Sequence, residues 1–209
     1  MLDHVLDAIQ PIIAAAQTQF RGSAIGCGDI RNAPLFLRLG ARLRGPKDIT
    51  VGTLKRVIIH DITCYGPAND MPVIISGIPG HPVEDISISN VFLVQRGGGP
   101  DGLTAVDPPE QEKDYPEPSR FAPLPAQALF MRHAKAVDVS DVAIASEAAD
   151  ARPVYWLDDV DGASFSHLRV PRNASGPTFL LHHTRNFRVV ASDAVPDTAL
   201  GMVAQKSLP

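Results

Sequence analysis

The chain is poor in cysteine and in aromatic residues. It has 209 residues, only two of which are cysteines, and aromatic side chains make up 6% of it. Two cysteines, Cys27 and Cys64, leave a single disulfide open but do not make a disulfide framework. No apolar run is long enough to span a membrane, and a net charge of −4 disfavours nucleic acid as a partner. The first residues show no basic region and no cleavage site, so no signal peptide is predicted and the localisation stays open.

What the chain does have is a repeated unit of two short segments. The first segment is apolar, and its copies begin at Leu35, Val73, Leu129, Val154 and Thr178. The second alternates apolar and polar residues, and each copy carries an Asn, Asp or His before an apolar residue, at Asp61, Asn90, Asp141, His167 and Asp193. The two series stay in step along the chain, which indicates a repeat architecture.

The alternation has the period of a β-strand, and it breaks at the same point in every copy. Asn, Asp and His tolerate a positive φ better than other non-glycine residues, so the break predicts a bend. A unit of short strands joined by bends cannot bury its apolar face alone, and copies must stack with equivalent strands paired in parallel. The sequence therefore predicts an all-β fold, a right-handed parallel β-helix in which Val91, Val142 and Leu168 stack.

The predicted organisation has three parts. Residues 1–28 form an N-terminal helical cap or a non-native start, because apolar residues between 2 and 19 recur at helical spacing with Pro11 interrupting them. Residues 29–197 form the β-helix, with a proline-rich loop, 95–127, inserted and expected to project and border a cleft. Residues 198–209 read as a weakly structured tail. An uncovered first coil would expose strand edges, which predicts self-association there.

Three stretches carry a resemblance to a known family: VGTLKRVIIHDITCYGP, PEQEKDYPEPSRF and LPAQALFMRHAKAVDVSDVAI. They resemble the polygalacturonase-like enzymes of glycoside hydrolase family 28, bacterial branch, and the resemblance covers the C-terminal half of such a protein. It implies a single-stranded, pectate-lyase-like β-helix, inverting hydrolysis of pectic polysaccharides, an acidic polysaccharide or oligosaccharide as partner, and no cofactor. Members of the family are mostly exported.

The family's motifs are Asn-Thr-Asp, Asp-Asp, Gly-His-Gly and Arg-Ile-Lys in chain order, and only the last has a counterpart here. Arg38 stands at its Arg, Leu39 at its Ile, and Gly40 replaces its Lys. Inverting hydrolysis needs an acid and a base carboxyl, and no motif supplying them is present. We therefore expect the chain alone to be inactive, with Arg38 as the only catalytic candidate. The alternative is a non-catalytic β-helix that binds acidic polysaccharide or completes a split protein.

The first, apolar segment of each repeat unit is called the leading strand below. Polar residues at the ends of the leading strands are the candidate substrate-binding residues. Stacking would align Arg38 with Arg132, and Leu39, Gly77, His133, Asp158 and His182 one position further on. Guanidinium groups suit sugar carboxylates. The candidates are Arg38, Arg132, His133, Asp158, His81 and Tyr115. The competing interpretation makes the arginines partners of loop backbone and Tyr115 a loop anchor. His133, Asp158 and His182 lack a fourth ligand, so no metal site is predicted.

Overall fold

The computed structural model describes residues 20–22, 25–27, 32–43 and 50–209, the first two segments at the level of the backbone. The helix expected over residues 2–19 and the domain boundary at residues 28 and 29 lie outside this part of the chain. The strands are β1 Phe20–Gly22, β2 Ile25–Cys27, β3 Phe36–Arg38, β4 Lys55–Cys64, β5 Val73–Ser76, β6 Val83–Gln95, β7 Leu129–Ser146, β8 Tyr155–Ser166, β9 Phe179–Val190 and β10 Thr198–Leu208. Two short 3₁₀ helices, η1 Asp101–Ala105 and η2 Pro118–Phe121, lie between β6 and β7.

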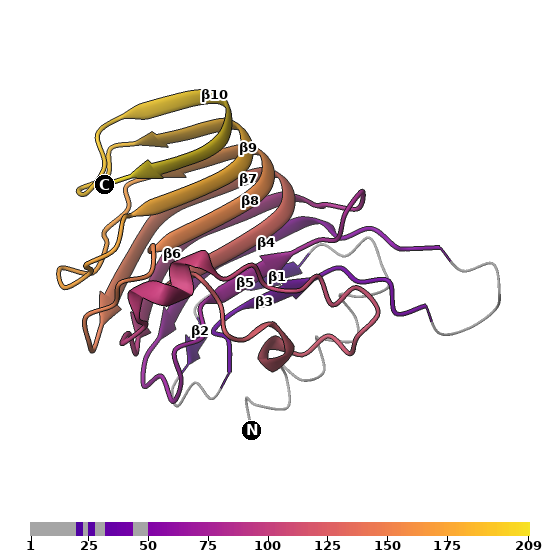
Figure 1. Ribbon diagram of the computed structural model, residues 1–209, viewed down its shortest axis with the longest axis horizontal. Helices are drawn as coiled ribbons and strands as arrows, with labels where there is room; N and C mark the ends of the chain where they lie inside the picture. The colour runs from indigo at the N-terminus through magenta and orange to yellow at the C-terminus, as the bar shows by residue number, and fades with distance from the viewer. Residues whose placement is uncertain (1–19, 23–24, 28–31, 44–49) are drawn as a thin grey trace.

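The ten strands of the described residues belong to one sheet, which is parallel except at its C-terminal end. Its main order is β1-β4-β6-β7-β8-β9-β10, and β5 lies between β3 and the first part of β7. Figure 1 shows these strands as a stack of curved ribbons, each lying beside the equivalent strand of the preceding repeat unit. The prediction of an all-β fold built on parallel stacking is confirmed.

The alternating segments pair in the predicted register. Val91 pairs with Val142, and the bridge from Ala143 to Arg169 keeps Leu168 beside Val142. The bend residue has a positive φ at Asp61, Asn90, Asp141 and His167, as predicted. The prediction is wrong in the last unit, where the bend falls at Ala191, with φ 50°, instead of Asp193. Alanine rarely adopts this conformation, so the stacking of Ser166 on Val190 and not local preference sets the position.

Two further columns of bends were not predicted. One contains Arg56, Asp85, Ala136, Gly162 and Asn186, and the other contains His133, Asp159 and His183, all with positive φ. The members of each column occupy equivalent places in adjacent strands. Because a column includes arginine and alanine, its residue types alone carry too weak a signal to be read from the sequence.

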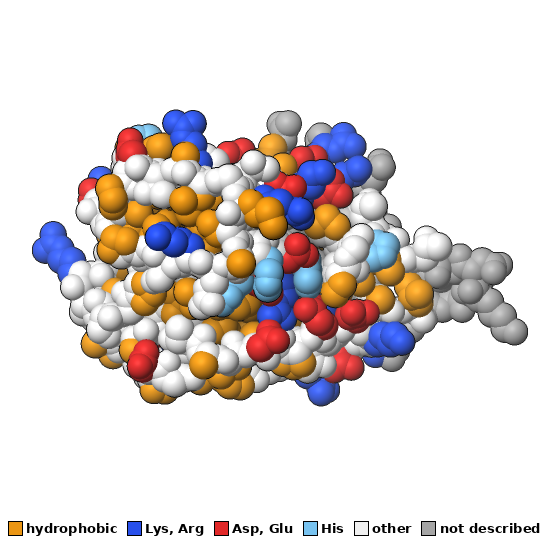
Figure 2. Space-filling view, turned by 45° about the horizontal axis from the view of Figure 1, so that its top comes forward, with side chains coloured by type: hydrophobic (Ala, Val, Ile, Leu, Met, Phe, Trp, Pro, Cys, Tyr) orange, Lys and Arg blue, Asp and Glu red, His pale blue; other side chains and the backbone are white. Residues whose placement is uncertain are grey.

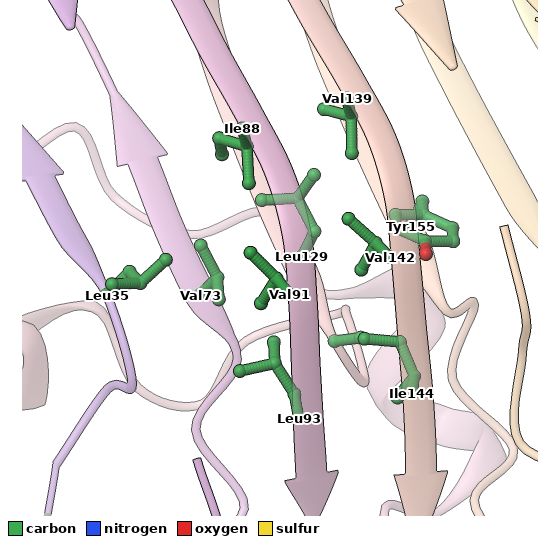
Figure 3. Close-up of a pocket in the computed structure, with 11 residues that line it drawn as sticks. Leu35, Val73, Ile88, Val91, Leu93, Leu129, Val139, Val142, Ile144 and Tyr155 are labelled. Carbon is green, nitrogen blue, oxygen red and sulfur yellow. The ribbon is translucent and has the colours of Figure 1, made fainter. Parts of the chain in front are cut away.

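The interior of the stack is narrow and apolar. Inward side chains such as Ile88, Val139, Leu129 and Tyr155 surround a small space in Figure 3, with a volume of about 20 Å³. The ring of Tyr155 stacks on Phe179 with centroids 4.9 Å apart, but the hydroxyl of Tyr155 is buried without a hydrogen-bond partner. Burial raises the pKa of Tyr155 above its ordinary value.

The segment between β6 and β7, called the insert below, covers the outer face of the leading strands. Phe121, Leu124 and Ala126 of the insert form a second apolar cluster with outward side chains of β5, β7, β8 and β9, namely Ile74, Phe130, Trp156 and Leu180. In Figure 1 the insert runs in front of the strands near the labels β5 and β3. The expectation that it projects away is therefore wrong in part: it is folded down because its apolar residues complete this cluster.

The last segment is a strand and not a weakly structured tail. β10 runs antiparallel to β9 over its whole length, placing Leu200 opposite Phe187 and Leu208 opposite Phe179. Only Leu208 of this strand is fully buried, and Gly201 and Met202 interrupt the alternation. The sequence pattern of residues 198–208 is therefore too weak to predict a strand. The segment is a strand because it pairs with the exposed edge of β9.

Candidate functional site

Polar side chains gather where the leading strands end. The strand register aligns Arg38, Ser76, Arg132, Asp158 and His182 in one column, and Leu39, Gly77, His133, Asp159 and His183 in the next. The sequence-based alignment placed Asp158 beside His133, which is wrong by one residue. The leading strands are buried on both faces, so their sequences lack the alternation that fixes register.

Arg38 is buried, and its donors are taken by the chain itself. Its guanidinium donates to Ser76 Oγ and the Gly77 carbonyl, both at 2.7 Å, and to the Glu110 carbonyl at 2.5 Å. The same group lies 4.9 Å above the ring of Phe121. Burial lowers the pKa of Arg38 to about 10, with Glu110 opposing the shift, so the side chain stays charged at neutral pH. Arg38 therefore fastens the insert to β3.

Arg132, 4% exposed, makes the densest set of polar contacts in the site. It donates to the Pro108 carbonyl at 2.7 Å, to Glu110 Oε1 at 3.2 Å and to the Asp107 carboxylate. Asp158 Oδ2 lies 3.2 Å from Arg132 Nε without hydrogen-bond geometry. The guanidinium also lies 5.3 Å from the ring of Trp156. The insert thus places two carboxylates, those of Asp107 and Glu110, on the Arg132 guanidinium.

His133 lies between two carboxylates. Its Nδ1 is 2.7 Å from Asp159 Oδ2, and its Nε2 is 3.0 Å from Glu110 Oε1. Glu110 Oε2 is buried and has no partner. A second histidine, His183 of β9, has its Nδ1 2.8 Å from Oδ1 of Asp158 in β8. Figure 2 shows histidine, acidic and basic side chains gathered near the middle of this face.

Arg132 is buried, whereas two carboxylates of the site, those of Asp107 and Asp159, are exposed. The side chain of Asp107 is 86% exposed and that of Asp159 is 49% exposed, whereas that of Arg132 is only 5% exposed. His182 lies 5.4 Å from the ring of Trp156, and desolvation lowers the pKa of His182, although the nearby Asp158 acts in the opposite direction. This face therefore presents carboxylate oxygens and imidazole side chains to solvent.

Two sequence candidates lie at the edge of the cluster. His81 is exposed in the turn that follows β5, where its carbonyl accepts the Ile78 amide hydrogen. Tyr115 is 56% exposed, and the guanidinium of Arg42 lies 4.7 Å from its ring. Gly40 faces the insert closely, since a Cβ there would lie 3.1 Å from the Glu112 carbonyl. Any side chain at position 40 would therefore require the backbone near Glu112 to shift by a few tenths of an ångström.

Sequence reasoning missed a buried ion pair at the other end of the leading strands. Arg152 Nε and Nη2 bind Asp150 Oδ1 and Oδ2 at 3.0 and 2.7 Å, and both residues are at most 1% exposed. Gly99 N also donates to Asp150, and a Cβ at Gly99 would lie 2.1 Å from Arg152 Nε. The only local signal is that Asp150 and Arg152 are two residues apart, and this spacing does not predict a buried ion pair.

A separate groove of about 490 Å³ runs along the bend column of Asn90, Asp141 and His167. It also contacts Phe92, which is 42% exposed, and Arg169. Along β7 it lies eight residues beyond His133, which corresponds to roughly 25 Å of strand. The groove is therefore distinct from the Arg132 site.

Within the described part of the chain, no group of three or more His, Cys, Asp or Glu side chains is arranged to hold a metal ion. Nor does any helix there have the length and apolar character needed to cross a membrane. The site can thus offer hydrogen bonding and charge pairing through its own side chains. Comparisons with family models, with curated proteins and with solved structures find no match to this chain.

Proposed function

We propose that this protein is a polygalacturonase-like, right-handed parallel β-helix that binds acidic polysaccharide and, by itself, does not hydrolyse it. The architecture is supported by parallel in-register pairing from β4 to β9 and by the stacked positive-φ bends. The ligand class follows from the family resemblance. The contacts of Arg132 indicate which residue would bind a carboxylate of that ligand.

The observation that carries the proposal is the carboxylate held by Arg132. Asp107 binds Arg132 Nη2, although the side chain of Asp107 is 86% exposed and belongs to the insert. A uronate carboxylate has the same chemistry and can replace Asp107 without any change in the core. Arginine pairs with carboxylates through its planar array of donors. Asp107 therefore acts as an internal substitute for the ligand.

The absence of hydrolysis follows from what the carboxylates do. An inverting glycosidase needs one carboxyl as acid and one as base on opposite sides of the scissile bond. Here Glu110 and Asp159 both contact His133, while Asp158 contacts His183 and lies beside Arg132. Arg38 cannot protonate a leaving oxygen, because it stays charged at working pH.

The test is calorimetric titration of the full chain with an oligogalacturonate at low salt. We expect Arg132→Gln to weaken binding about 10- to 100-fold, as for the loss of a charge-assisted hydrogen bond. Asp107→Ala should strengthen it about 2- to 5-fold, because the exposed Asp107 carboxylate, which competes with the ligand for Arg132, is removed; a contact to such a solvated carboxylate is worth about 0.2–1 kcal/mol. Phe92→Ala, in the separate groove, is the matched control and should bind like the wild type.

The proposal fails if the wild type binds no oligogalacturonate, or if Arg132→Gln binds as tightly as the wild type while remaining folded. Reducing-sugar release from polygalacturonate measures the second half of the proposal. Turnover that is abolished by Glu110→Gln or Asp159→Asn would show that these carboxylates act as the acid and base, and would refute the non-hydrolytic assignment.

A further inference from the structure

Among the residues that the structure describes, no strand pairs with the outer edge of β10. β10 closes the sheet order after β9, and Figure 1 shows no described segment beyond its outer edge. The strand is 11 residues long and has a single charged residue, Lys206, and no proline. Proteins usually shield such an edge with charges, proline, bulges or a covering segment, because its free N–H and C=O groups are a template for another strand.

The pattern of inward positions in β10 is symmetric about Val203. The buried residues of β9 that face the interior are Phe179, Leu181, Thr184, Phe187 and Val189, whereas the buried Leu180 packs in the outward cluster with the insert. The β10 residues opposite them are Leu208, Lys206, Val203, Leu200 and Thr198. These positions lie three and five residues on either side of Val203. A symmetric pattern is the same in both chain directions. When the strand pairs antiparallel with an identical strand about Val203, each inward position therefore lies opposite an inward position.

We propose that β10 pairs with β10 of a second copy of this chain, antiparallel, about a two-fold axis through Val203. In this register Met202 lies opposite Ala204 of the other copy, Leu200 opposite Lys206, and Thr198 opposite Leu208. All inward positions of one copy meet inward positions of the other. The sheet and its interior then continue from one copy into the next, which is an isologous interface.

Exposed apolar surface and charge both favour a second copy as the partner. Leu200 and Val203 are only partly buried against the core, and Met202 is 78% exposed. A second β10 would cover these side chains. Lys206 is never opposite itself in this register, so no like charges meet, and its stem can lie over Leu200 while its ammonium reaches solvent.

The experiment is sedimentation velocity on the full chain. The concentration is varied upward from about 1 µM, because an interface made by one pair of strands is small and therefore weak. We expect the wild type to form a dimer. Met202→Asp/Ala204→Asp places carboxylates opposite each other and should weaken dimerisation at least about 10-fold. Met202→Asp/Ala204→Lys, the matched control, places opposite charges there and should restore it. Circular dichroism checks that each variant folds, which is expected because Met202 and Ala204 are exposed.

A wild type that stays monomeric at every concentration overturns the inference. So does a dimer that survives the Asp/Asp change, since it must then use another surface, such as the edge at the N-terminal end. Crosslinking gives a second readout. Val203→Cys meets itself on the two-fold axis and should form a covalent dimer on oxidation. Ala199→Cys, which would lie opposite Ser207 and eight residues along the strand from its equivalent, should not. Equal crosslinking of the two variants refutes the proposed register.

Discussion

Separating the buried ion pair of Asp150 and Arg152 should destabilise the protein strongly. Asp150 accepts from Arg152 Nε, from Arg152 Nη2 and from the backbone N–H groups of Arg152 and Gly99. Arg152 Nη1 also donates to the carbonyls of Asp70 and Leu124 at 3.3 Å. The pair therefore joins the turn after β4, the glycine-rich start of the insert, the end of the insert and the turn after β7.

Asp150 is fully buried and has no other cation among the described residues when Arg152 is removed, whereas Arg152 keeps the half-exposed Asp70 carboxylate, whose Oδ2 lies 3.4 Å from Arg152 Nη1. Breaking a buried pair costs about 3–5 kcal/mol, because an uncompensated charge is left in the interior. In a chain of this size we expect Arg152→Met and Asp150→Ala each to lower the Tm by about 6–20 °C. Urea unfolding followed by circular dichroism measures the corresponding loss in the free energy of unfolding.

The matched control is the exposed pair of Arg185 and Asp161, whose Nε and Oδ2 atoms lie 3.9 Å apart and whose side chains are 52% and 39% exposed. Arg185→Met should cost at most about 1 kcal/mol. A loss below about 1 kcal/mol for Arg152→Met would refute the reasoning, since it would mean that Asp150 finds water or another cation.

The same pair predicts a pH dependence with a definite sign. Burial alone would raise the pKa of Asp150, but the hydrogen bonds from Arg152 and Gly99 outweigh it and hold the pKa below its ordinary value. A carboxyl whose pKa is lower in the folded state stabilises the fold above its unfolded pKa. That contribution is lost as the pH falls through the folded pKa. Asp150→Asn should therefore unfold with a weaker dependence on pH in acid than the wild type, and an unchanged acid limb would contradict this.

Two further substitutions test the interior and the bends. Tyr155→Phe should be neutral or stabilising by about 1 kcal/mol, because the hydroxyl it removes is buried without a partner; a loss above about 1 kcal/mol in urea unfolding would reveal a partner for that hydroxyl. Asp141→Val should cost about 1–3 kcal/mol, since φ is 54° there, whereas Asp141→Gly should be tolerated. Equal thermal stability of the Asp141 variants would show that this bend is not strained.

The amino-acid sequence by itself determined the strand content, the parallel stacking and one column of bends. These features are local: apolar residues alternate with period two around Asn90 and Asp141, and both residue types tolerate a positive φ. The sequence also identified Arg38, Arg132 and His133 as polar residues at the ends of leading strands. Each of these features can be predicted from the residues of a single repeat unit.

The tertiary structure decided the register of the leading strands and the partners of the polar residues. Where both faces of a strand are buried, no alternation remains to align Arg132 with Asp158, and only the stack does so. The contacts of Asp107 and Glu110 with Arg132 join residues more than 20 positions apart across the insert. They depend on where Phe121 packs, which no local pattern near Glu110 encodes. The conformation of β10 likewise follows from the exposed edge of β9, because its own alternation is too weak to specify a strand.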